Sequence, residues 1–287
     1  MNQLLVIGAG TMGHGIAQVA ATAGYAVALV DTTEELANAG LARIAENLAH
    51  AVRRAGLDPA APVAILGRIR TTSSVAAAAA QAAFVIEAVP ERMALKQAVF
   101  AQLDAVVPAD ALLASNTSSL SITELQRGTR SPGRVIGLHF FNPVPSNPLV
   151  EVVRGDDTNG ETVTRALELV HTLGKQTVLV KDSPGFATSR LGVLLGLEAM
   201  RMLEEGVAGA ADIDRAMELG YRHPMGPLRV SDLVGLDVRL AIARELHAKL
   251  GGERFRPPRI LERLVAEGKL GRKTGQGFYE WPARAAV

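Results

Sequence analysis

Residues 4–17 read LLVIGAGTMGHGIA, and this stretch decides the fold class. The run LLVIG at 4–8 is short and apolar, which predicts a buried strand, and residues 11–24 then repeat apolar and small side chains at helical spacing. A second apolar run of strand type, YAVALVD, follows directly at 25–31. Strand, helix and strand in this order predict a βαβ unit, with two parallel strands joined by the helix.

The same alternation of strands and helices continues along the chain. A helical pattern covers roughly 33–56, and the alanine-rich stretch at 74–83 predicts a surface helix, because alanine is the best helix former. Strands that alternate with helices predict an α/β fold of Rossmann type, in which a doubly wound, mostly parallel sheet carries helices on both faces. The further elements are expected, in chain order, at 82–89, Glu91 to about Val106, 112–116, 134–141, 149–155, 160–172 and 175–182.

The pattern changes at DSPGFATSR, residues 182–190. Pro184 and Gly185 favour a turn, and beyond them the strand signals stop. We therefore predict two domains, a Rossmann-type domain at 1–183 and an all-helical domain at 184–287. The helical patterns of the second domain cover 191–206, 211–220, 227–250 and 260–268.

Composition narrows the class of protein. The 287 residues are 48% hydrophobic and can bury a large core. Thirty basic and 29 acidic residues leave a net charge of +1, without a block of like charge that would bind nucleic acid. There is no cysteine, so disulfides and thiolate sites are excluded, and no histidine spacing indicates a metal site. The chain opens on an apolar strand, and no stretch is long enough to span a membrane, so a cytoplasmic enzyme or binding protein is expected.

The stretch GAGTMG, which begins at Gly8, fits the dinucleotide-binding pattern G-x-G-x-x-G between a predicted strand and a predicted helix. Gly8 permits the tight turn, Gly10 lets the main chain approach a pyrophosphate, and Gly13 lets the helix pack closely on the strand. Thr11 and Met12 lie where the helix N-terminus presents N–H groups to the anion. The alternative is a glycine-rich turn that only packs.

Asp31 follows the second strand, eighteen positions after Gly13. A carboxylate at this place can accept hydrogen bonds from both ribose hydroxyls of a dinucleotide. The next residues are Thr32 and Thr33, not arginine, so a 2′-phosphate would meet negative charge without compensation. The sequence therefore predicts NAD rather than NADP.

Further motifs follow the glycine loop in a fixed order, and together they span nearly the whole chain. They are SNTSSL at 115–120, HFFNPVPSNPLVEV at 139–152, SPGFATSRL at 183–191, HPMGPL at 223–228 and GRKTGQGFYEW at 271–281. These motifs resemble those of the 3-hydroxyacyl-CoA dehydrogenases, in particular the single-function 3-hydroxybutyryl-CoA type. The resemblance implies an NAD-binding domain, a helical domain that forms a homodimer, and oxidation of an L-3-hydroxyacyl-CoA to the 3-ketoacyl-CoA or its reversal.

His139 and Glu151 stand in two predicted strands joined by the proline-rich turn NPVPSNP, and they can face each other if the strands lie side by side. Hydride loss from a secondary alcohol requires a base for the hydroxyl proton, and imidazole, which titrates at about pH 6.5 in water, suits neutral pH. A carboxylate on the other ring nitrogen fixes the tautomer. The resemblance implies that the two are the family's catalytic histidine and its partner glutamate. By itself, a lone histidine in an apolar strand is usually a core residue.

Ser118 and Asn142 are polar and uncharged, as suits contact with a substrate oxygen or a nicotinamide carboxamide, and the resemblance implies both contacts. Read without the family, Ser118 is equally well a helix cap ahead of ITELQ at 122–126. Glu91 and Lys96 match family positions near the cofactor. On their own they indicate a solvated helix face.

Lys273, in GRKTGQG, also matches a family position close to NAD, although a basic residue in a glycine-rich tail is usually just exposed. Asn47 and Arg54 match positions for the coenzyme A tail, and seven residues apart they share one helical face. Ser189 departs from the family, which usually has an asparagine before Arg-Leu to reach the substrate near the catalytic histidine. Serine keeps a donor and an acceptor but is shorter and lacks the amide.

Two other functions stay open. A related dehydrogenase of a free 3-hydroxy acid would keep the same catalytic pair and differ on the side of Asn47 and Arg54. A nucleotide-binding module without turnover would need no general base. The presence of His139, Glu151 and Ser118 together argues against that module.

Overall fold

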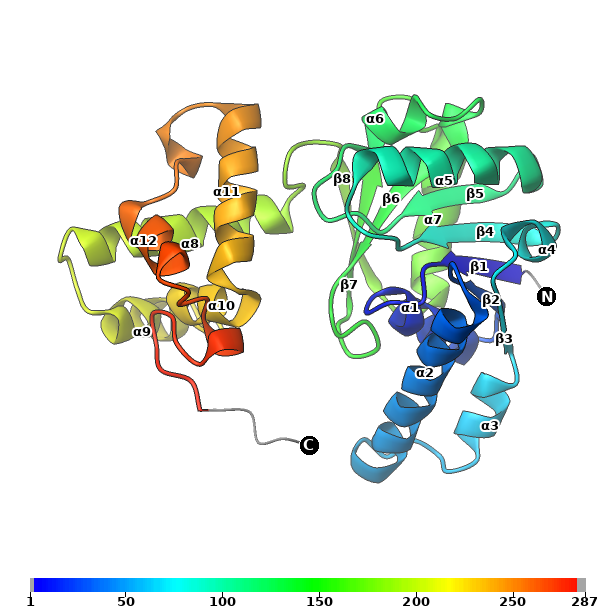
Figure 1. Ribbon diagram of the computed structural model, residues 1–287, viewed down its shortest axis with the longest axis horizontal. Coiled ribbons are helices and arrows are strands. Elements are labelled where there is room, and N and C mark those ends of the chain that lie inside the picture. Colours follow the sequence, from blue (N-terminus) through cyan, green and yellow to red (C-terminus); the bar gives the residue numbers. More distant parts are fainter. Residues whose placement is uncertain (1–2, 283–287) are drawn as a thin grey trace. The chain divides into compact units, whose positions relative to one another are not determined.

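A computed structural model describes residues 3–282, and the chain divides into two compact units after Phe186. The first unit is built on one sheet of eight strands in the order β3-β2-β1-β4-β5-β6-β7-β8 (Figure 1). Neighbouring strands are parallel except β6 and β7, which pair antiparallel, so the predicted Rossmann-type, mostly parallel sheet is confirmed. The strands are β1 (Gln3–Ile7), β2 (Ala26–Val30), β3 (Ile69–Thr72), β4 (Ala82–Glu87), β5 (Leu112–Ser115), β6 (Val135–Phe140), β7 (Leu149–Arg154) and β8 (Gln176–Lys181).

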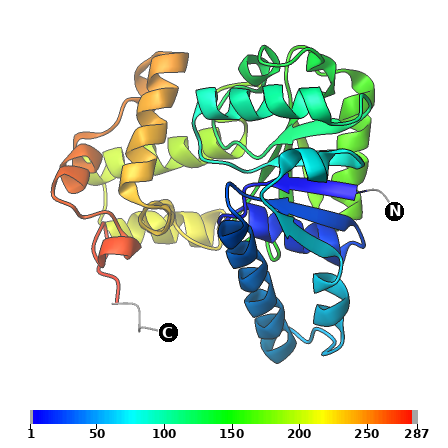
Figure 2. The same cartoon turned by 45° about the vertical axis from the view of Figure 1, so that its right-hand side comes forward.

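Helices cover both faces of this sheet (Figures 1 and 2). Strand β1 shows why the strands read as continuous apolar runs: Leu4 and Val6 enter one core cluster, and Leu5 and Ile7 enter the other. The first cluster is covered by α1 (Gly13–Thr22), α2 (Glu34–Arg54), α3 (Ala61–Leu66) and α7 (Gly160–Thr172). The second is covered by α4 (Val75–Ala79), α5 (Met93–Val106) and α6 (Ile122–Gln126).

Two stretches of the first unit differ from the sequence-based expectation. The predicted surface helix at 74–83 is only the five-residue α4, and its Ala78 and Ala79 are buried in the core, because β4 already begins at Ala82. The short elements α3 and β3 have no predicted counterpart. They span six and four residues, too few to show a clear period of apolar side chains.

The second unit is helical, as expected. The long pattern predicted at 227–250 is interrupted at Gly235, whose φ of 107° separates two helices. No helix within residues 3–282 has the length and apolar character needed to cross a membrane. The helices are α8 (Thr188–Glu204), α9 (Ala210–Gly220), α10 (Pro227–Val234), α11 (Leu236–Leu250) and α12 (Arg259–Ala266), and single 3₁₀ turns lie at Pro132–Arg134 in the first unit and at Glu253–Phe255 and Arg272–Thr274 in the second.

Two buried carboxylates bind the last described residues to these helices. Asp232 accepts hydrogen bonds from the main-chain N–H groups of Phe278 and Tyr279 and from the indole of Trp281, each at 2.9 Å. Asp214 accepts one from the hydroxyl of Tyr279 at 2.7 Å. Because a buried carboxylate must keep its donors, this segment is part of the helical unit rather than a free tail.

A tight turn precedes the boundary between the units. The N–H of Phe186 donates to the carbonyl of Ser183 at 2.9 Å, and Gly185 has a φ of 75°. Pro184 and Gly185 therefore hold the two central positions of a type II turn. Phe186 has a φ of 48° and packs into the core of the first unit.

Candidate active site

The strand order places a topological switch point between β1 and β4, because the chain continues from β1 to α1 on one face of the sheet and from β4 to α5 on the other. The main chain is crowded there. A Cβ on Gly8 would lie 2.7 Å from the carbonyl oxygen of Ala88, and a Cβ on Gly13 would overlap the carbonyl of Gly8. Gly8 also has a φ of 98°. The turn and the packing therefore require glycine at both positions.

Gly10 differs from these two glycines. It is exposed, and a Cβ there would meet no protein atom within 4 Å, so the packing of the protein does not require glycine. Helix α1 has neither a side-chain cap nor an acidic residue in its first turn. Thr11 is exposed and Met12 half-buried at the same helix end. An anion held against the main chain accounts for both features, and the pyrophosphate of a dinucleotide fits this place.

Asp31, just after β2, is fixed against the glycine loop. Its Oδ2 accepts from the N–H of Ala9 at 2.7 Å, and its Oδ1 accepts from the N–H and the hydroxyl of Thr32 at 2.7 and 3.2 Å. A carboxylate has about four acceptor sites, so the half-buried Asp31 can still accept from a ligand hydroxyl. Thr33 caps α2, with its hydroxyl 3.3 Å from the N–H of Leu36.

Glu91, which follows β4, binds the turn after β5. Its Oε1 accepts from the hydroxyl of Thr117 at 2.6 Å and from the main-chain N–H groups of Ser118 and Ser119 at 2.8 and 3.1 Å. Glu91 therefore fixes the main chain at Ser118. Ser118 itself is exposed. The reading of Ser118 as a helix cap is wrong, because Ser121 is the N-cap of α6.

Lys96 is fully buried, so the reading of a solvated helix face is wrong for it. Its ammonium donates to Oε1 of Glu87 at 2.7 Å and to the carbonyl of Val89 at 3.1 Å, and it lies 3.4 Å from Oε2 of Glu91. Glu87 also accepts from the hydroxyl of Ser115 at 2.6 Å. This buried charge is thus paired, as burial requires, and it ties the end of β4 to Glu91.

His139 and Glu151 lie opposite each other in the antiparallel pair β6–β7, which confirms the predicted geometry. Nδ1 of His139 is 2.7 Å from Oε2 of Glu151, with His139 6% exposed and Glu151 fully buried. When Glu151 is ionised, its carboxylate has no hydrogen to donate, and Nδ1 then carries the hydrogen of this contact. In the neutral ring, Nε2 then holds the lone pair and can accept a proton.

Two phenylalanines that the sequence does not single out pack on this imidazole. The ring centroid of Phe141 lies 4.3 Å from that of His139, and the centroid of Phe186 lies 5.9 Å away. Phe186 keeps a left-handed main chain, which costs a non-glycine residue about 1–2 kcal/mol. Apolar rings around the pair lower the local dielectric and strengthen the hydrogen bond to Glu151.

Asn142 stands in the turn between β6 and β7. It is exposed and is joined to Pro143 by a cis peptide bond. The end of β6 is fixed to the loop after β5, because the N–H of Phe140 donates to Oδ1 of Asn116 at 2.9 Å. The segments that carry Asn142 and Ser118 therefore begin at the ends of two adjacent parallel strands.

The residues predicted for the coenzyme A tail lie on α2. Asn47 and Arg54 are both exposed, and the Asn47 amide donates to Oε1 of Gln18 on α1 at 3.3 Å. Ser189 belongs to the other unit, where it lies in the first turn of α8 and is half-buried.

Lys273 also belongs to the helical unit and is held in place. Its side chain is 46% exposed, and its ammonium is 2.6 Å from each carboxylate oxygen of Asp237. The hydrogen bond from Lys273 lowers the pKa of Asp237. Asp237 is therefore ionised at neutral pH.

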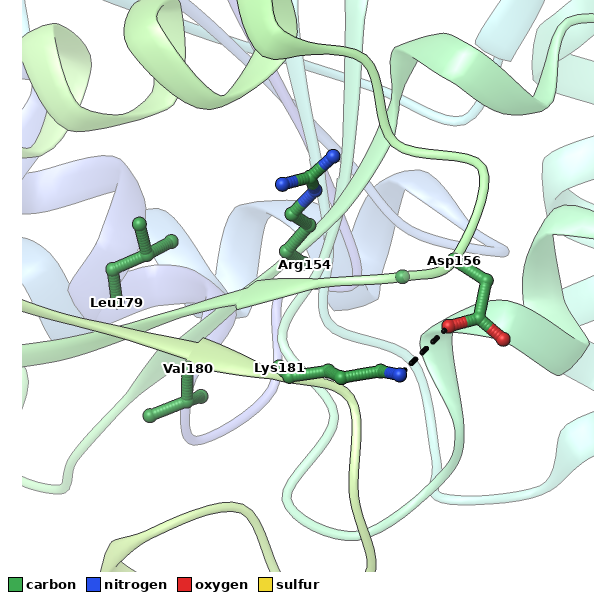
Figure 3. Close-up of a pocket in the computed structure, with 6 residues that line it drawn as sticks. Arg154, Asp156, Leu179, Val180 and Lys181 are labelled. Atoms are coloured by element: carbon green, nitrogen blue, oxygen red, sulfur yellow. Dashed lines mark ion pairs between the residues drawn. The ribbon is translucent and has the colours of Figure 1, made fainter.

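A pocket away from these residues lies at the ends of β7 and β8 (Figure 3). None of the residues predicted for nucleotide or substrate lines it. Lys181 points toward Asp156 there, with Nζ 3.6 Å from Oδ1. Both side chains are mostly exposed, so this ion pair contributes little to the stability of the fold. The strand ends described above, not this pocket, form the candidate active site. The pocket is lined by Arg154, Gly155, Asp156, Leu179, Val180 and Lys181.

Comparison with known proteins identifies the family. The chain matches the model of the 3-hydroxyacyl-CoA dehydrogenase NAD binding domain over residues 3–183 and that of the C-terminal domain over 185–281. It is 43% identical over 286 residues to a probable 3-hydroxybutyryl-CoA dehydrogenase of Bacillus subtilis, covering 100% of this chain and 99% of the relative.

Solved structures give the same result. The crystal structure of the (S)-3-hydroxybutyryl-CoA dehydrogenase from Ralstonia eutropha is similar with a TM-score of 0.95 and 39% identity, over 99% of this chain and 100% of that one. A diketoreductase that acts on dicarbonyl compounds is similar with a TM-score of 0.86 and 30% identity, over 98% of this chain and 99% of that one. The chain therefore belongs to the 3-hydroxyacyl-CoA dehydrogenase family and is an NAD-dependent oxidoreductase.

Proposed function

We propose that the enzyme oxidises a short-chain L-3-hydroxyacyl-CoA, such as 3-hydroxybutyryl-CoA, to the 3-ketoacyl-CoA with NAD, or catalyses the reverse. The observation that carries this proposal is the buried pair of His139 and Glu151, 2.7 Å apart. His139 stands near the carboxyl end of β6, in the same sheet as the strands that end in the nucleotide loops. A general base at this place suits the oxidation of an alcohol.

In the oxidation, Nε2 of His139 takes the proton of the 3-hydroxyl as the carbonyl forms, while Nδ1 keeps its hydrogen toward Glu151. The ring becomes an imidazolium, which the carboxylate stabilises. NAD, when bound, supplies the acceptor for the hydride that leaves the same carbon. In the reverse direction, Nε2 returns the proton to the alkoxide oxygen. Phe141 and Phe186 pack against the ring and reduce its contact with water.

The residues of the glycine loop hold the nucleotide in this proposal. Gly10 lets the pyrophosphate approach the main chain, and Thr11 and Met12 flank it at the N-terminus of α1. Asp31 accepts from the ribose hydroxyls and disfavours a 2′-phosphate. The crowding at Gly8 supports its part in this loop.

Around the reacting centre, Ser118 and Asn142 donate to the substrate oxygen or the nicotinamide carboxamide. Glu91 holds the turn of Ser118, and Lys96 acts through Glu91, because its donors are already engaged within the protein. Lys273 is assigned to the cofactor.

The coenzyme A tail is assigned to α2. The amide of Asn47 and the guanidinium of Arg54 are exposed there. Both groups can donate hydrogen bonds to a phosphorylated nucleotide. We assign the substrate side of the helical unit to Ser189. We also propose that the chain forms two domains, residues 1–183 and residues 184–287.

A homodimer through the helical unit is part of the proposal. Large apolar side chains remain exposed on this unit, and a partner would cover them. Leu191 is 60% exposed, Leu219 76% and Tyr221 75%.

The test is the loss of NADH absorbance on adding acetoacetyl-CoA, compared with free acetoacetate. Faster turnover of the thioester supports the proposal. Turnover of free acetoacetate with equal kcat/KM would show the related dehydrogenase of a free 3-hydroxy acid. NADH binding with no turnover of any 3-ketoacyl-CoA would instead leave a nucleotide-binding module.

A further inference from the structure

The turn at 142–148 is poor in hydrogen-bond donors. Three of its seven residues are prolines, which have no main-chain N–H. The N–H groups of Ser146 and Asn147 both donate to the carbonyl of Pro143, at 3.2 and 2.9 Å. Other carbonyls of the turn therefore need donors from elsewhere in the protein.

Lys175 supplies these donors. It stands directly before β8 and is 8% exposed. Its ammonium donates to the main-chain carbonyls of Val144 at 2.7 Å, Pro145 at 3.1 Å and Asn147 at 2.8 Å. An ammonium has three hydrogens, so these three acceptors use its full donor capacity.

No carboxylate compensates this charge. Lys175 takes part in none of the ion pairs found within residues 3–282, and burial lowers the pKa of its ammonium. A buried cation without a counter-charge is costly unless hydrogen bonds replace its water. Here the three carbonyl groups of the turn take the place of that water.

This turn connects the parts of the proposed active site. It carries Asn142 and joins the strand of His139 to the strand of Glu151. It also packs on the nucleotide helix, because a Cβ on Gly15 of α1 would lie 2.9 Å from Cβ of Val144. A shift of the turn would therefore disturb the catalytic pair and its neighbours together.

We propose that Lys175 is a positioning residue for the reaction: its ammonium gathers the carbonyls of the turn and so holds His139 against Glu151 and keeps Asn142 at the site. The inference rests on the proposed dehydrogenase function. A misplacement of about 1 Å can slow an enzyme about 100-fold, so the loss of this ammonium shows in turnover.

The test compares Lys175→Met with Lys181→Met. Methionine keeps a long, flexible side chain but donates no hydrogen bond. Lys181 is the matched control, because it lies at the other end of β8, its side chain is 80% exposed, and its ammonium lies 3.6 Å from the exposed carboxylate of Asp156 (Figure 3). Both substitutions remove one positive charge. The measurements are NADH binding, kcat and KM with acetoacetyl-CoA, the pH–rate profile and amide exchange of the turn.

In Lys175→Met we expect kcat per NADH-binding site to fall about 10- to 100-fold, with KM for the thioester changed less than about 3-fold. The acid limb of kcat/KM moves to lower pH, because a carboxylate held less firmly against the base stabilises its protonated form less. The amides of Ser146 and Asn147 exchange faster without cofactor. Lys181→Met leaves all of these readouts as in the wild type.

Two results would overturn the inference. One is a kcat and pH profile in Lys175→Met within about 2-fold of Lys181→Met. The other is a loss of activity that the lost NADH-binding sites fully account for, since Lys175 is then only structural.

If Lys175→Met does not fold, Lys175→Gln decides, because its amide keeps two N–H donors on a shorter side chain. A reduced kcat per NADH-binding site supports the inference, and a wild-type kcat contradicts it. A wild type without turnover would reject the dehydrogenase proposal instead. The exchange of Ser146 and Asn147 still tests whether Lys175 holds the turn.

Discussion

His139 and Glu151 face each other across β6 and β7, with Nδ1 and Oε2 2.7 Å apart. Both alternate with residues of the first core cluster, so they lie on the sheet face covered by α5 and α6, as Val135 and Val153 of the same strands do. The pair is therefore held by the pairing of two strands, which the turn at 142–148 joins.

Replacing His139 by glutamine removes the base without removing the polar side chain. We expect kcat to fall by about 10² to 10⁴, the usual contribution of a general base, while NADH affinity and the melting temperature stay near wild type. Steady-state kinetics with acetoacetyl-CoA and fluorescence titration of NADH measure the two quantities. Near-full turnover in His139→Gln would show that this histidine is only a core residue.

Glu151→Gln is the companion variant, because it keeps the shape of the side chain and removes its charge. Without the carboxylate, the imidazolium is stabilised less, so the acid limb of the pH–rate profile should move to lower pH and kcat should fall. An unchanged profile would separate Glu151 from the reaction.

Asp31 should set the choice of nucleotide. Asp31→Ala removes a charged acceptor from the ribose hydroxyls, and such a hydrogen bond contributes about 1.5–3 kcal/mol. We expect kcat/KM for NAD to fall by a corresponding factor and kcat/KM for NADP not to fall. The preference for NAD over NADP should therefore become smaller. Equal kcat/KM for NAD and NADP in the unmodified enzyme would contradict the assignment.

Ser189 tests the one departure from the family pattern. A shorter hydroxyl can reach the substrate oxygen through a water, and such a bridge costs at most about 2 kcal/mol. Ser189→Asn should therefore change kcat/KM for the acyl-CoA by less than about 2 kcal/mol in either direction, with an unchanged Kd for NADH. A large change in NADH affinity would place Ser189 at the nucleotide.

The pair of Lys273 and Asp237 should give a pH-dependent term in stability. The hydrogen bond from Lys273 lowers the pKa of Asp237 in the folded protein below the unfolded value of about 3.9. Its stabilisation is thus fully present above about pH 4 and is lost as the pH falls through the folded pKa. The difference in urea midpoint between wild type and Asp237→Asn should be constant from about pH 8 to pH 5 and shrink below about pH 4. A difference that grows on acidification would contradict this sign.

The sequence predicts the parts of this molecule that depend on local pattern. Each strand is a short apolar run because both sheet faces are covered. The glycine loop can be recognised in the sequence because the crowded main chain at Gly8 and Gly13 leaves no room for a side chain. The contact of His139 with Glu151 follows from two such strands joined by one short turn.

Other features escape prediction because their cause is remote in sequence or lies in the main chain. Lys175 binds carbonyls 28 to 31 residues away, and carbonyls leave no trace in side-chain patterns. Lys96 is buried against Glu87 at the end of β4, which helical spacing cannot show. Phe186 reaches His139 through a left-handed φ that bulky residues seldom adopt.

The antiparallel register of β6 and β7 also limits how this family member can change over evolution. Side chains alternate between the faces of a strand, so a one-residue insertion or deletion that slides β7 past β6 would turn Glu151 to the opposite face and bring a valine in front of His139. The turn at 142–148 can accept substitutions that leave the hydrogen bonds of its carbonyls to Lys175 in place. Its length, however, must stay fixed if Glu151 is to remain opposite His139.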